Sequence, residues 1–218
     1  MKKIIGITGS SGSGKTTVTK ILEKELKAKA IYADEVVKQM QKPNSEYFEK
    51  IVDLFGYDIL DKVDKGTVLL SKKGNFGQEN RPLVQLNRKK IADIIFQNQE
   101  QKDRLDKLTY KYVVEEIKKQ ITTAEENYVI IDAPLLIESR LNEICDIVIG
   151  VVSEKKEQIK RICNRDNIEE SKAILRLEAQ KDNEFYKKNV DYIVENNGGN
   201  YDEFVGRIRK LVQKLQQM

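Results

Sequence analysis

Short apolar runs alternate along this chain with longer segments in which apolar residues recur at helical spacing. The runs that read as buried strands are residues 3–8, 30–33, 128–132, 146–152 and 192–194. Such runs are typical of strands buried on both faces, and helices between them favour parallel pairing. The pattern therefore predicts an α/β fold with a parallel sheet covered by helices on both sides.

The connecting segments carry the helical spacing. The expected helices are residues 16–26, 35–41, 45–54, 88–97, 99–122, 154–165 and 168–181, with a last one after Asn200. In that last helix the apolar stripe consists of Phe204, Ile208, Leu211, Val212 and Leu215. Residues 61–88 break the pattern with glycines, a proline and scattered lysines, so we expect a long excursion with at most short strands, part of it mobile.

Residues 9–16, GSSGSGKT, fit the phosphate-loop pattern GxxxxGK[ST] and lie between the first predicted strand and helix. Glycines let such a loop turn its N–H groups toward phosphate oxygens, and the helix adds its positive N-terminal end. Lys15 supplies a charge for the terminal phosphates, and the Thr16 hydroxyl is the expected Mg²⁺ ligand. A plain glycine-serine turn is the alternative. The residues expected to bind nucleotide are Gly9, Gly12, Ser13, Gly14, Lys15, Thr16 and Thr17.

Composition narrows the partners and the chemistry. The apolar and charged fractions, 39% and 34%, are those of a globular protein, and no run approaches the ~18 apolar residues that span a bilayer. A strand begins almost at residue 1, so we expect no secretory signal, no membrane association and a cytoplasmic location. The net charge of +4 is spread along the chain, which does not indicate nucleic-acid binding.

Histidine is absent, so a general base must be a carboxylate, a Lys or a Tyr. Cys145 and Cys163 read as buried, inert thiols.

Two acidic residues follow predicted strands, whose carboxyl ends are where open α/β sheets bind ligands. Asp34 ends the second strand and is a candidate base for a hydroxyl group, or a helix N-cap; spacing leaves both roles open. Asp132 follows four apolar residues and is a candidate Mg²⁺ ligand, or a polar strand end. Glu138 is compatible with a helix cap, an ion pair or a substrate contact.

Two arginines share one face of a predicted helix between the fourth and fifth strands. Arg161 and Arg165 are one turn apart, and planar guanidinium groups suit the charge on a transferring phosphoryl group. Surface ion pairing is the alternative for each of them, and Arg176 on the next helix is a further candidate. Asn197 lies in the NNGG segment at 196–199, which is compatible with a turn or with a contact to the adenine edge.

Several segments together resemble the dephospho-coenzyme A kinase family. In chain order they are IGITG at 5–9, YADE at 32–35, FGYDIL at 55–60, DAPLLIE at 132–138, RICNRD at 161–166 with Arg176 and Gln180, and DYIVENNG at 191–198. They cover most of the chain, and PLLxE with RxxxRD is far more specific than the phosphate loop. The resemblance implies transfer of a phosphoryl group from ATP, with Mg²⁺, to the ribose 3′-hydroxyl of dephospho-CoA, the last step of CoA synthesis.

The resemblance also implies an architecture and residue roles. We expect a single P-loop kinase domain with a five-stranded sheet of order 2-3-1-4-5, a core at 1–35, 124–153 and 183–218, a helical substrate-binding insertion at 36–123 and a helical lid at 154–182. Asp34 becomes the catalytic base. The other implied roles are charge stabilisation by Lys15, Arg161 and Arg165 and substrate contacts by Thr8, Arg88 and Glu138.

Two departures from the family concern the substrate-binding segment. Residues 108–111, LTYK, occupy the place where the family has a His-Pro pair, and the family's short DGxxDR link is expanded into 61–88. A kinase of another nucleoside or nucleotide therefore stays open as an alternative. A GTPase-like switch is a second alternative, because residues 53–56 spell DxxG, but that motif ends a predicted helix and no NKxD motif accompanies it.

Overall fold

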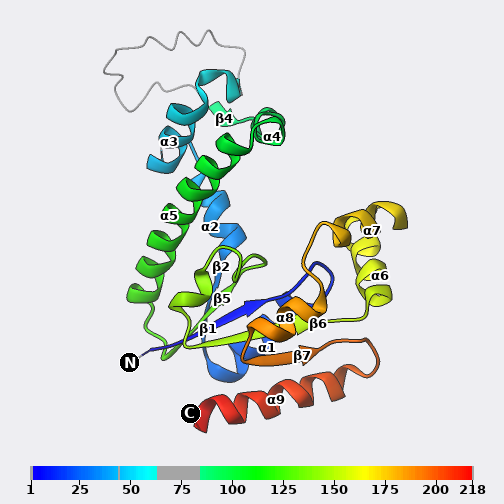
Figure 1. Ribbon diagram of the computed structural model, residues 1–218. Helices are drawn as coiled ribbons and strands as arrows, with labels where there is room; N and C mark the ends of the chain where they lie inside the picture. The colour runs from blue at the N-terminus through cyan, green and yellow to red at the C-terminus, as the bar shows by residue number, and fades with distance from the viewer. Residues whose placement is uncertain (1, 44, 63–83, 218) are drawn as a thin grey trace. The chain divides into compact units, whose positions relative to one another are not determined.

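The structure is a computed structural model that describes residues 2–43, 45–62 and 84–217 (Figure 1). These residues form two compact units. The first consists of Met1–Ala33 with Ile117–Met218, and the second of Asp34–Glu116. Each unit has its own core. No helix among the described residues is long and apolar enough to cross a membrane.

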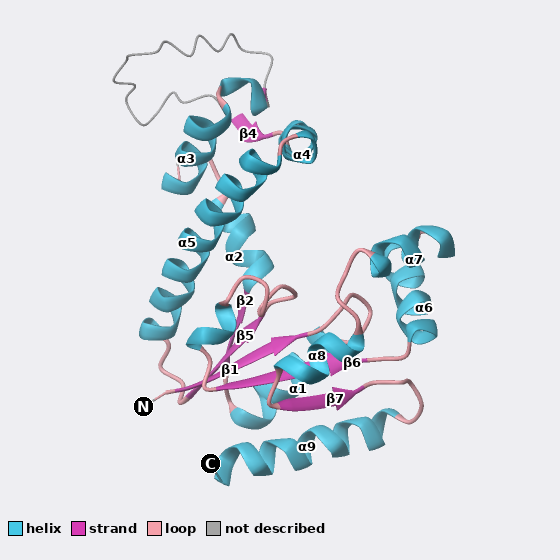
Figure 2. Ribbon diagram, in the orientation of Figure 1, coloured by secondary structure: helices cyan, strands magenta, loops and turns pink. Residues whose placement is uncertain are grey.

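A five-stranded parallel sheet forms the centre of the first unit (Figure 2). Its strands are β1 (Lys3–Thr8), β2 (Lys29–Tyr32), β5 (Tyr128–Asp132), β6 (Ile147–Val152) and β7 (Tyr192–Glu195). Their order, β2-β5-β1-β6-β7, confirms the predicted 2-3-1-4-5. Asp132 lies in register with Ile7 on one side and with Tyr32 on the other, so these carboxyl ends reach the same sheet edge.

Helices α1 (Lys15–Leu26) and α9 (Tyr201–Gln217) pack on each other and on one face of this sheet. All five residues of the predicted α9 stripe are buried, and they share one core with the β-strand residues Ile5, Ile7 and Ile149. The chain leaves β1 toward β2 in one direction and later adds β6 and β7 in the other. Helix α8 (Asn183–Asn189) packs on β6. Because both crossover connections are right-handed, α1 and α8 lie on opposite faces of the sheet.

The segment between β6 and β7 also contains α6 (Lys155–Asp166) and α7 (Glu170–Glu178), which pack against each other. The sequence predicts one helix over 168–181 in this region, whereas α7 ends at Glu178 and α8 is missed. Asp182 caps α8, its carboxylate accepting a hydrogen bond from the Phe185 N–H at 2.8 Å. That acidic N-cap is the signal that could have identified this short helix.

The second unit is mainly helical. Its elements are α2 (Ala33–Met40), α3 (Glu46–Phe55), η1 (Tyr57–Ile59), β3 (Leu60–Lys62), β4 (Val84–Leu86), α4 (Arg88–Gln97) and α5 (Gln99–Thr123), which continues into the first unit. Tyr47, Ile51 and Ile59 form the buried centre of its core. The ends of the predicted excursion at 61–88 form the antiparallel pair β3-β4. Its middle, 63–83, where mobility is expected from the sequence, lies outside the described residues.

Candidate active site

The phosphate loop joins β1 to α1, and backbone conformation explains its glycines. Gly9, Gly12 and Gly14 have φ angles of 145°, 74° and 97°, in the region that side chains disfavour. Space is also closed: a Cβ on Gly9 would lie 2.2 Å from the Val151 carbonyl oxygen, and one on Gly14 would lie 2.1 Å from Asn196 Nδ2. The loop conformation therefore requires glycine at these motif positions. An ordinary glycine-serine turn would not impose that requirement.

The loop offers groups that suit an anion. The Lys15 ammonium lies against the loop and donates to the carbonyl oxygens of Gly9 at 2.7 Å and Ser10 at 3.1 Å. The Ser13 hydroxyl is buried and has no hydrogen-bond partner among the described residues. A buried polar atom without a partner is costly. Phosphate oxygens would satisfy it, so the loop fits the nucleotide expected from the sequence.

Asp132 lies at the end of β5 and is buried. The hydroxyl of Thr19, on α1, donates to Asp132 Oδ2 at 2.8 Å, and both side chains are buried. Thr16, at the start of the same helix, is exposed. The described residues contain no cluster of three or more His, Cys, Asp or Glu side chains that could hold a metal. Oxygen ligands from Thr16 and Asp132 suit Mg²⁺, which usually takes few protein ligands and completes its shell with phosphate and water.

Thr8 and Glu138, both expected at the substrate, differ in exposure. The Thr8 side chain is fully buried and its hydroxyl donates to the Pro134 carbonyl oxygen at 3.2 Å, so it supports the segment that follows β5. Glu138 is exposed. Tyr186 has a pKa of about 12, raised mainly by burial and further by the nearby charge of Glu138.

Arg165 and Arg176 meet at one carboxylate. Arg165 Nε and Nη2 donate to Asp166 at 2.8 and 2.9 Å, and Arg176 binds the same carboxylate. These guanidinium groups, Arg165 first, lower the pKa of Asp166 to about 2. Arg165 also donates to the Ser11 hydroxyl at 3.3 Å, so one arginine of this segment contacts the phosphate loop directly.

The Arg161 side chain also contacts the phosphate loop, through a backbone carbonyl oxygen of the loop. Its Nη1 donates to the Gly12 carbonyl oxygen at 3.1 Å, and its Nη2 donates to that of Asn196 at 3.0 Å. Gln180 accepts a hydrogen bond from the Ser11 N–H at 2.7 Å. A further residue, Gln158, was not predicted from the sequence. It lies one helical turn before Arg161 and also binds the loop. Its position on the arginine-bearing face was the available signal.

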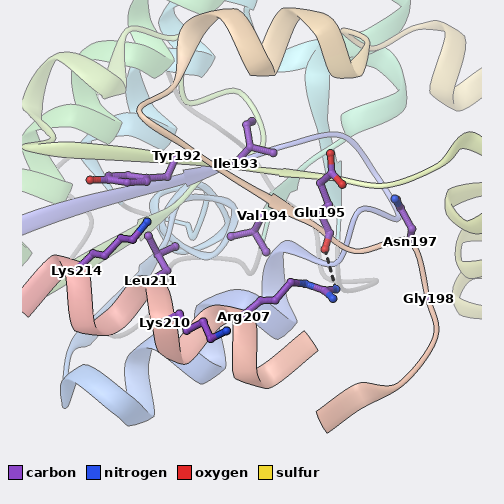
Figure 3. Close-up of a pocket in the computed structure, with 10 residues that line it drawn as sticks. All are labelled: Tyr192, Ile193, Val194, Glu195, Asn197, Gly198, Arg207, Lys210, Leu211 and Lys214. Atoms are coloured by element: carbon purple, nitrogen blue, oxygen red, sulfur yellow. Dashed lines mark hydrogen bonds between the residues drawn. The ribbon is translucent and has the colours of Figure 1, made fainter. Parts of the chain in front are cut away.

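Asn197, predicted at the adenine edge, accepts a hydrogen bond from the Glu154 N–H at 2.9 Å. It also borders a hollow of about 500 Å³ between β7 and α9 (Figure 3). Arg207 reaches across this hollow to the Glu195 carbonyl oxygen at 3.4 Å, and Lys210 and Lys214 line it as well. None of the phosphate-loop residues lines the hollow. The hollow is therefore separate from the phosphate loop.

Two predicted site residues belong to the second unit. Asp34 is exposed and lies in the first turn of α2, which begins at Ala33. The sequence predicts a strand through Ala33 and leaves Asp34 open as a base or a helix N-cap; instead β2 ends at Tyr32, and Asp34 is the second residue of α2, not its N-cap. Arg88, the first residue of α4, donates from Nη2 to Gln41 Oε1 at 2.8 Å.

A parallel sheet of this order, a phosphate loop after its first strand and an arginine-bearing segment bound to that loop together define a P-loop kinase. A sequence model of the dephospho-CoA kinase family matches residues 3–202. The chain therefore belongs to the dephospho-CoA kinase family.

Individual members of the family are similar over nearly the whole chain. The dephospho-CoA kinase of Leptospira interrogans is 33% identical over 213 residues, covering 97% of this chain and 92% of that protein. That of Fusobacterium nucleatum is 33% identical over 201 residues, covering 92% and 93%. The solved structure of the dephospho-CoA kinase from Campylobacter jejuni is similar with a TM-score of 0.62 at 26% identity, covering 100% of this chain and 98% of that one.

Proposed function

We propose that this protein transfers the γ-phosphoryl group of ATP to the ribose 3′-hydroxyl of dephospho-CoA, giving CoA and ADP in the last step of CoA synthesis. The observation that carries the proposal is the family match over residues 3–202, which includes both the phosphate loop and the lid motif. A different nucleoside acceptor is not favoured, because the relatives matched over almost their whole length are dephospho-CoA kinases. A cytoplasmic location is part of the proposal.

In this proposal the loop holds the triphosphate. Backbone N–H groups of the loop and of the N-terminal end of α1 bind phosphate oxygens, together with Lys15 and the buried Ser13 hydroxyl. The remaining nucleotide ligands are Gly9, Gly12, Gly14, Thr16 and Thr17 at the phosphates and Asn197 at the adenine. Thr16 and Asp132 would hold Mg²⁺, which supplies charge neutralisation at the phosphates when bound.

Asp34 is proposed as the base. Tyr32, the last residue of β2, is paired with Asp132, and Asp34 follows it by two positions, in the region where parallel sheets place ligand-binding residues. A carboxylate there orients the acceptor hydroxyl and accepts its proton late, because a loose transition state mainly requires alignment. Thr8, Arg88 and Glu138 are proposed as the acceptor contacts, Thr8 acting through the segment it supports.

The lid residues would act on the transferring group. Arg161 and Arg165, with Lys15, would stabilise negative charge on the phosphoryl oxygens. Closure of 154–182 would exclude water and so limit hydrolysis of ATP. In the proposed domain organisation, residues 1–35, 124–153 and 183–218 form the nucleotide-binding core, and residues 36–123 bind the acceptor.

An acceptor screen tests the function. With ATP and Mg²⁺, ADP release is measured in a coupled assay with dephospho-CoA, adenosine, AMP and a 3′-deoxy analogue of dephospho-CoA. We expect turnover with dephospho-CoA alone, and a product whose mass and 3′-phosphate identify it as CoA. Faster turnover with adenosine or AMP would instead assign the protein to another kinase activity.

The Asp34→Asn variant tests the base. We expect turnover to fall by about 10²–10⁴-fold, the range for loss of a general base, while ATP affinity stays near its original value. Nucleotide affinity is measured by calorimetry with a non-hydrolysable ATP analogue. The matched variant Glu35→Gln removes a neighbouring exposed carboxylate and should leave turnover within about twofold. Near-normal turnover of Asp34→Asn would exclude Asp34 as the base.

A further inference from the structure

Gln158 is one of the few polar side chains buried in the first unit, with an exposed fraction of 5%. It lies on α6 and its carboxamide points at the phosphate loop. The Nε2 group donates to the Ser10 hydroxyl and to the Ser11 carbonyl oxygen, the latter at 3.2 Å. The backbone of Gln158 also lies close to the loop: a Cβ on Gly12 would lie 2.6 Å from the Gln158 carbonyl oxygen. One residue therefore contacts three consecutive positions of the loop.

These contacts determine where the loop N–H groups point. In a trans peptide the carbonyl and the following N–H point in opposite directions. A hydrogen bond from Gln158 to the Ser11 carbonyl therefore turns the Gly12 N–H away from α6. The Ser13 carbonyl is held in the same way, by Asn196 Nδ2 at 2.9 Å and Arg161 Nη1 at 3.4 Å, which orients the Gly14 N–H.

We propose that Gln158 is a positioning residue for nucleotide binding, which fixes the Ser11–Gly12 peptide in the orientation that presents its N–H to phosphate. The inference rests on the proposed function only in taking a nucleoside triphosphate as the ligand of the loop. Without the carboxamide this glycine-containing loop samples other conformations, because glycine restricts the backbone least. The nucleotide must then order the loop as it binds, and that ordering lowers its affinity.

Substitution by methionine isolates the carboxamide. Gln158→Met keeps a long, unbranched side chain and removes both donated hydrogen bonds. We expect its dissociation constant for a non-hydrolysable ATP analogue with Mg²⁺, measured by calorimetry, to rise about tenfold, which two ordinary hydrogen bonds account for. The KM for ATP should rise equally, while kcat and the KM for dephospho-CoA stay within about twofold.

Substitution by glutamate adds a pH signature. Ionised Gln158→Glu cannot donate to the Ser11 carbonyl and adds negative charge beside the phosphates, so nucleotide affinity should fall further than in Gln158→Met. When protonated it can donate again, and burial raises the pKa of a carboxyl group. Affinity of this variant should therefore recover between pH 8 and pH 5.5, relative to wild type at each pH. A purely structural role would not produce that recovery.

Lys160→Met is the matched control, because Lys160 lies on the same helix and is exposed. Unchanged nucleotide affinity in folded Gln158→Met would overturn the proposal, as would an equal loss in Lys160→Met. If Gln158→Met does not fold, the pH dependence of Gln158→Glu decides: recovery supports the proposal and a flat profile overturns it. Nucleotide binding is measured without acceptor, so failure of dephospho-CoA as a substrate would leave this test intact.

Discussion

Gly14 shows most directly how one residue limits the conformation of the phosphate loop. Its φ is 97°, and Asn196 Nδ2 lies 2.1 Å from the position that a Cβ would take, which leaves no room for a side chain. Gly14→Ala must therefore displace Asn196 and shift the loop. We expect ATP affinity to fall by about tenfold or more, since strain of this kind costs about 1–3 kcal/mol. Isothermal calorimetry provides the measurement.

Gly56 supplies the matched control for that variant. Its φ is also positive, at 81°, but nothing lies within 4 Å of a Cβ added there. Gly56→Ala should therefore lower the melting temperature through backbone strain and leave ATP affinity unchanged. Equal losses of affinity in the two variants would show that strain alone, without the Asn196 contact, accounts for the effect of Gly14→Ala.

The surroundings of Cys145 lower the reactivity of its thiol by raising its pKa. Burial, and secondarily the charge of Asp146, raise its thiol pKa to about 12. At pH 8 the thiol is then almost entirely protonated, and the thiolate is the reactive form. We expect iodoacetamide to label Cys145 far more slowly in the folded protein than in urea, as measured by mass spectrometry. Cys145 and Cys163, expected from the sequence to be buried, are only partly buried in the structure. Rapid labelling of Cys145 in the folded protein at pH 8 would contradict its raised pKa.

The same thiol makes stability depend on alkaline pH. Its pKa is higher in the folded state than the ordinary value of 9.0, so the unfolded chain loses the proton first as pH rises. The contribution of the neutral thiol is therefore complete below pH 9 and is lost progressively toward pH 12. Cys145→Ala removes this dependence, and comparison of urea unfolding at pH 8 and pH 10 measures it.

At the scale of elements, Thr19 and Asp132 connect α1 to β5 through a buried hydrogen bond of 2.8 Å. Thr19→Val keeps the shape of the side chain and removes this donor from a buried carboxylate. We expect a loss of about 1–3 kcal/mol in the free energy of unfolding, together with a higher Mg²⁺ requirement, because Asp132, the proposed Mg²⁺ ligand, loses one of the bonds that orient it. Urea denaturation and Mg²⁺ titration of activity test the two effects.

Thr122 provides a comparison for Thr19. Its hydroxyl donates to the Lys118 carbonyl oxygen on the exposed surface of α5. Thr122→Val should change the free energy of unfolding by less than about 0.5 kcal/mol, because water replaces the lost bond. A similar small change for Thr19→Val would show that the buried bond contributes little to holding α1 on the sheet.

The elements also show which parts of the sequence were informative. The five strands and the α9 stripe were predictable, because burial on two faces or on one stripe leaves a strong apolar pattern. The N-cap alternative for Asp34 was wrong, since the residue lies in the first turn of α2, and a helix start is defined by backbone geometry that side-chain types constrain only weakly. Gln158 was missed because its contacts with residues 10–12 join segments far apart in the sequence; helical spacing puts it on the same face as Arg161 but does not show that this face meets the loop.

At the scale of the whole molecule, the proposed nucleotide contacts all lie in one unit, whereas the proposed acceptor contacts come from both: Thr8 and Glu138 from the first and Arg88 from the second. Every residue proposed for the nucleotide lies in Met1–Ala33 or Ile117–Met218, whereas Arg88, proposed for the acceptor, lies in Asp34–Glu116. A ligand stabilises the part of a protein that binds it, and local opening can be measured separately for each part. Binding of nucleotide should therefore be visible as a regional effect.

Hydrogen–deuterium exchange tests this division. With Mg²⁺ and a non-hydrolysable ATP analogue, we expect slower exchange in β1, the phosphate loop and α6, because the loop and its carbonyl partners become ordered. Peptides from α3 and α4 should be unchanged by nucleotide alone and should respond only when dephospho-CoA is added. Lys15→Ala serves as the control that abolishes the first response. Equal protection of α3 by nucleotide alone would show instead that the two units respond as one.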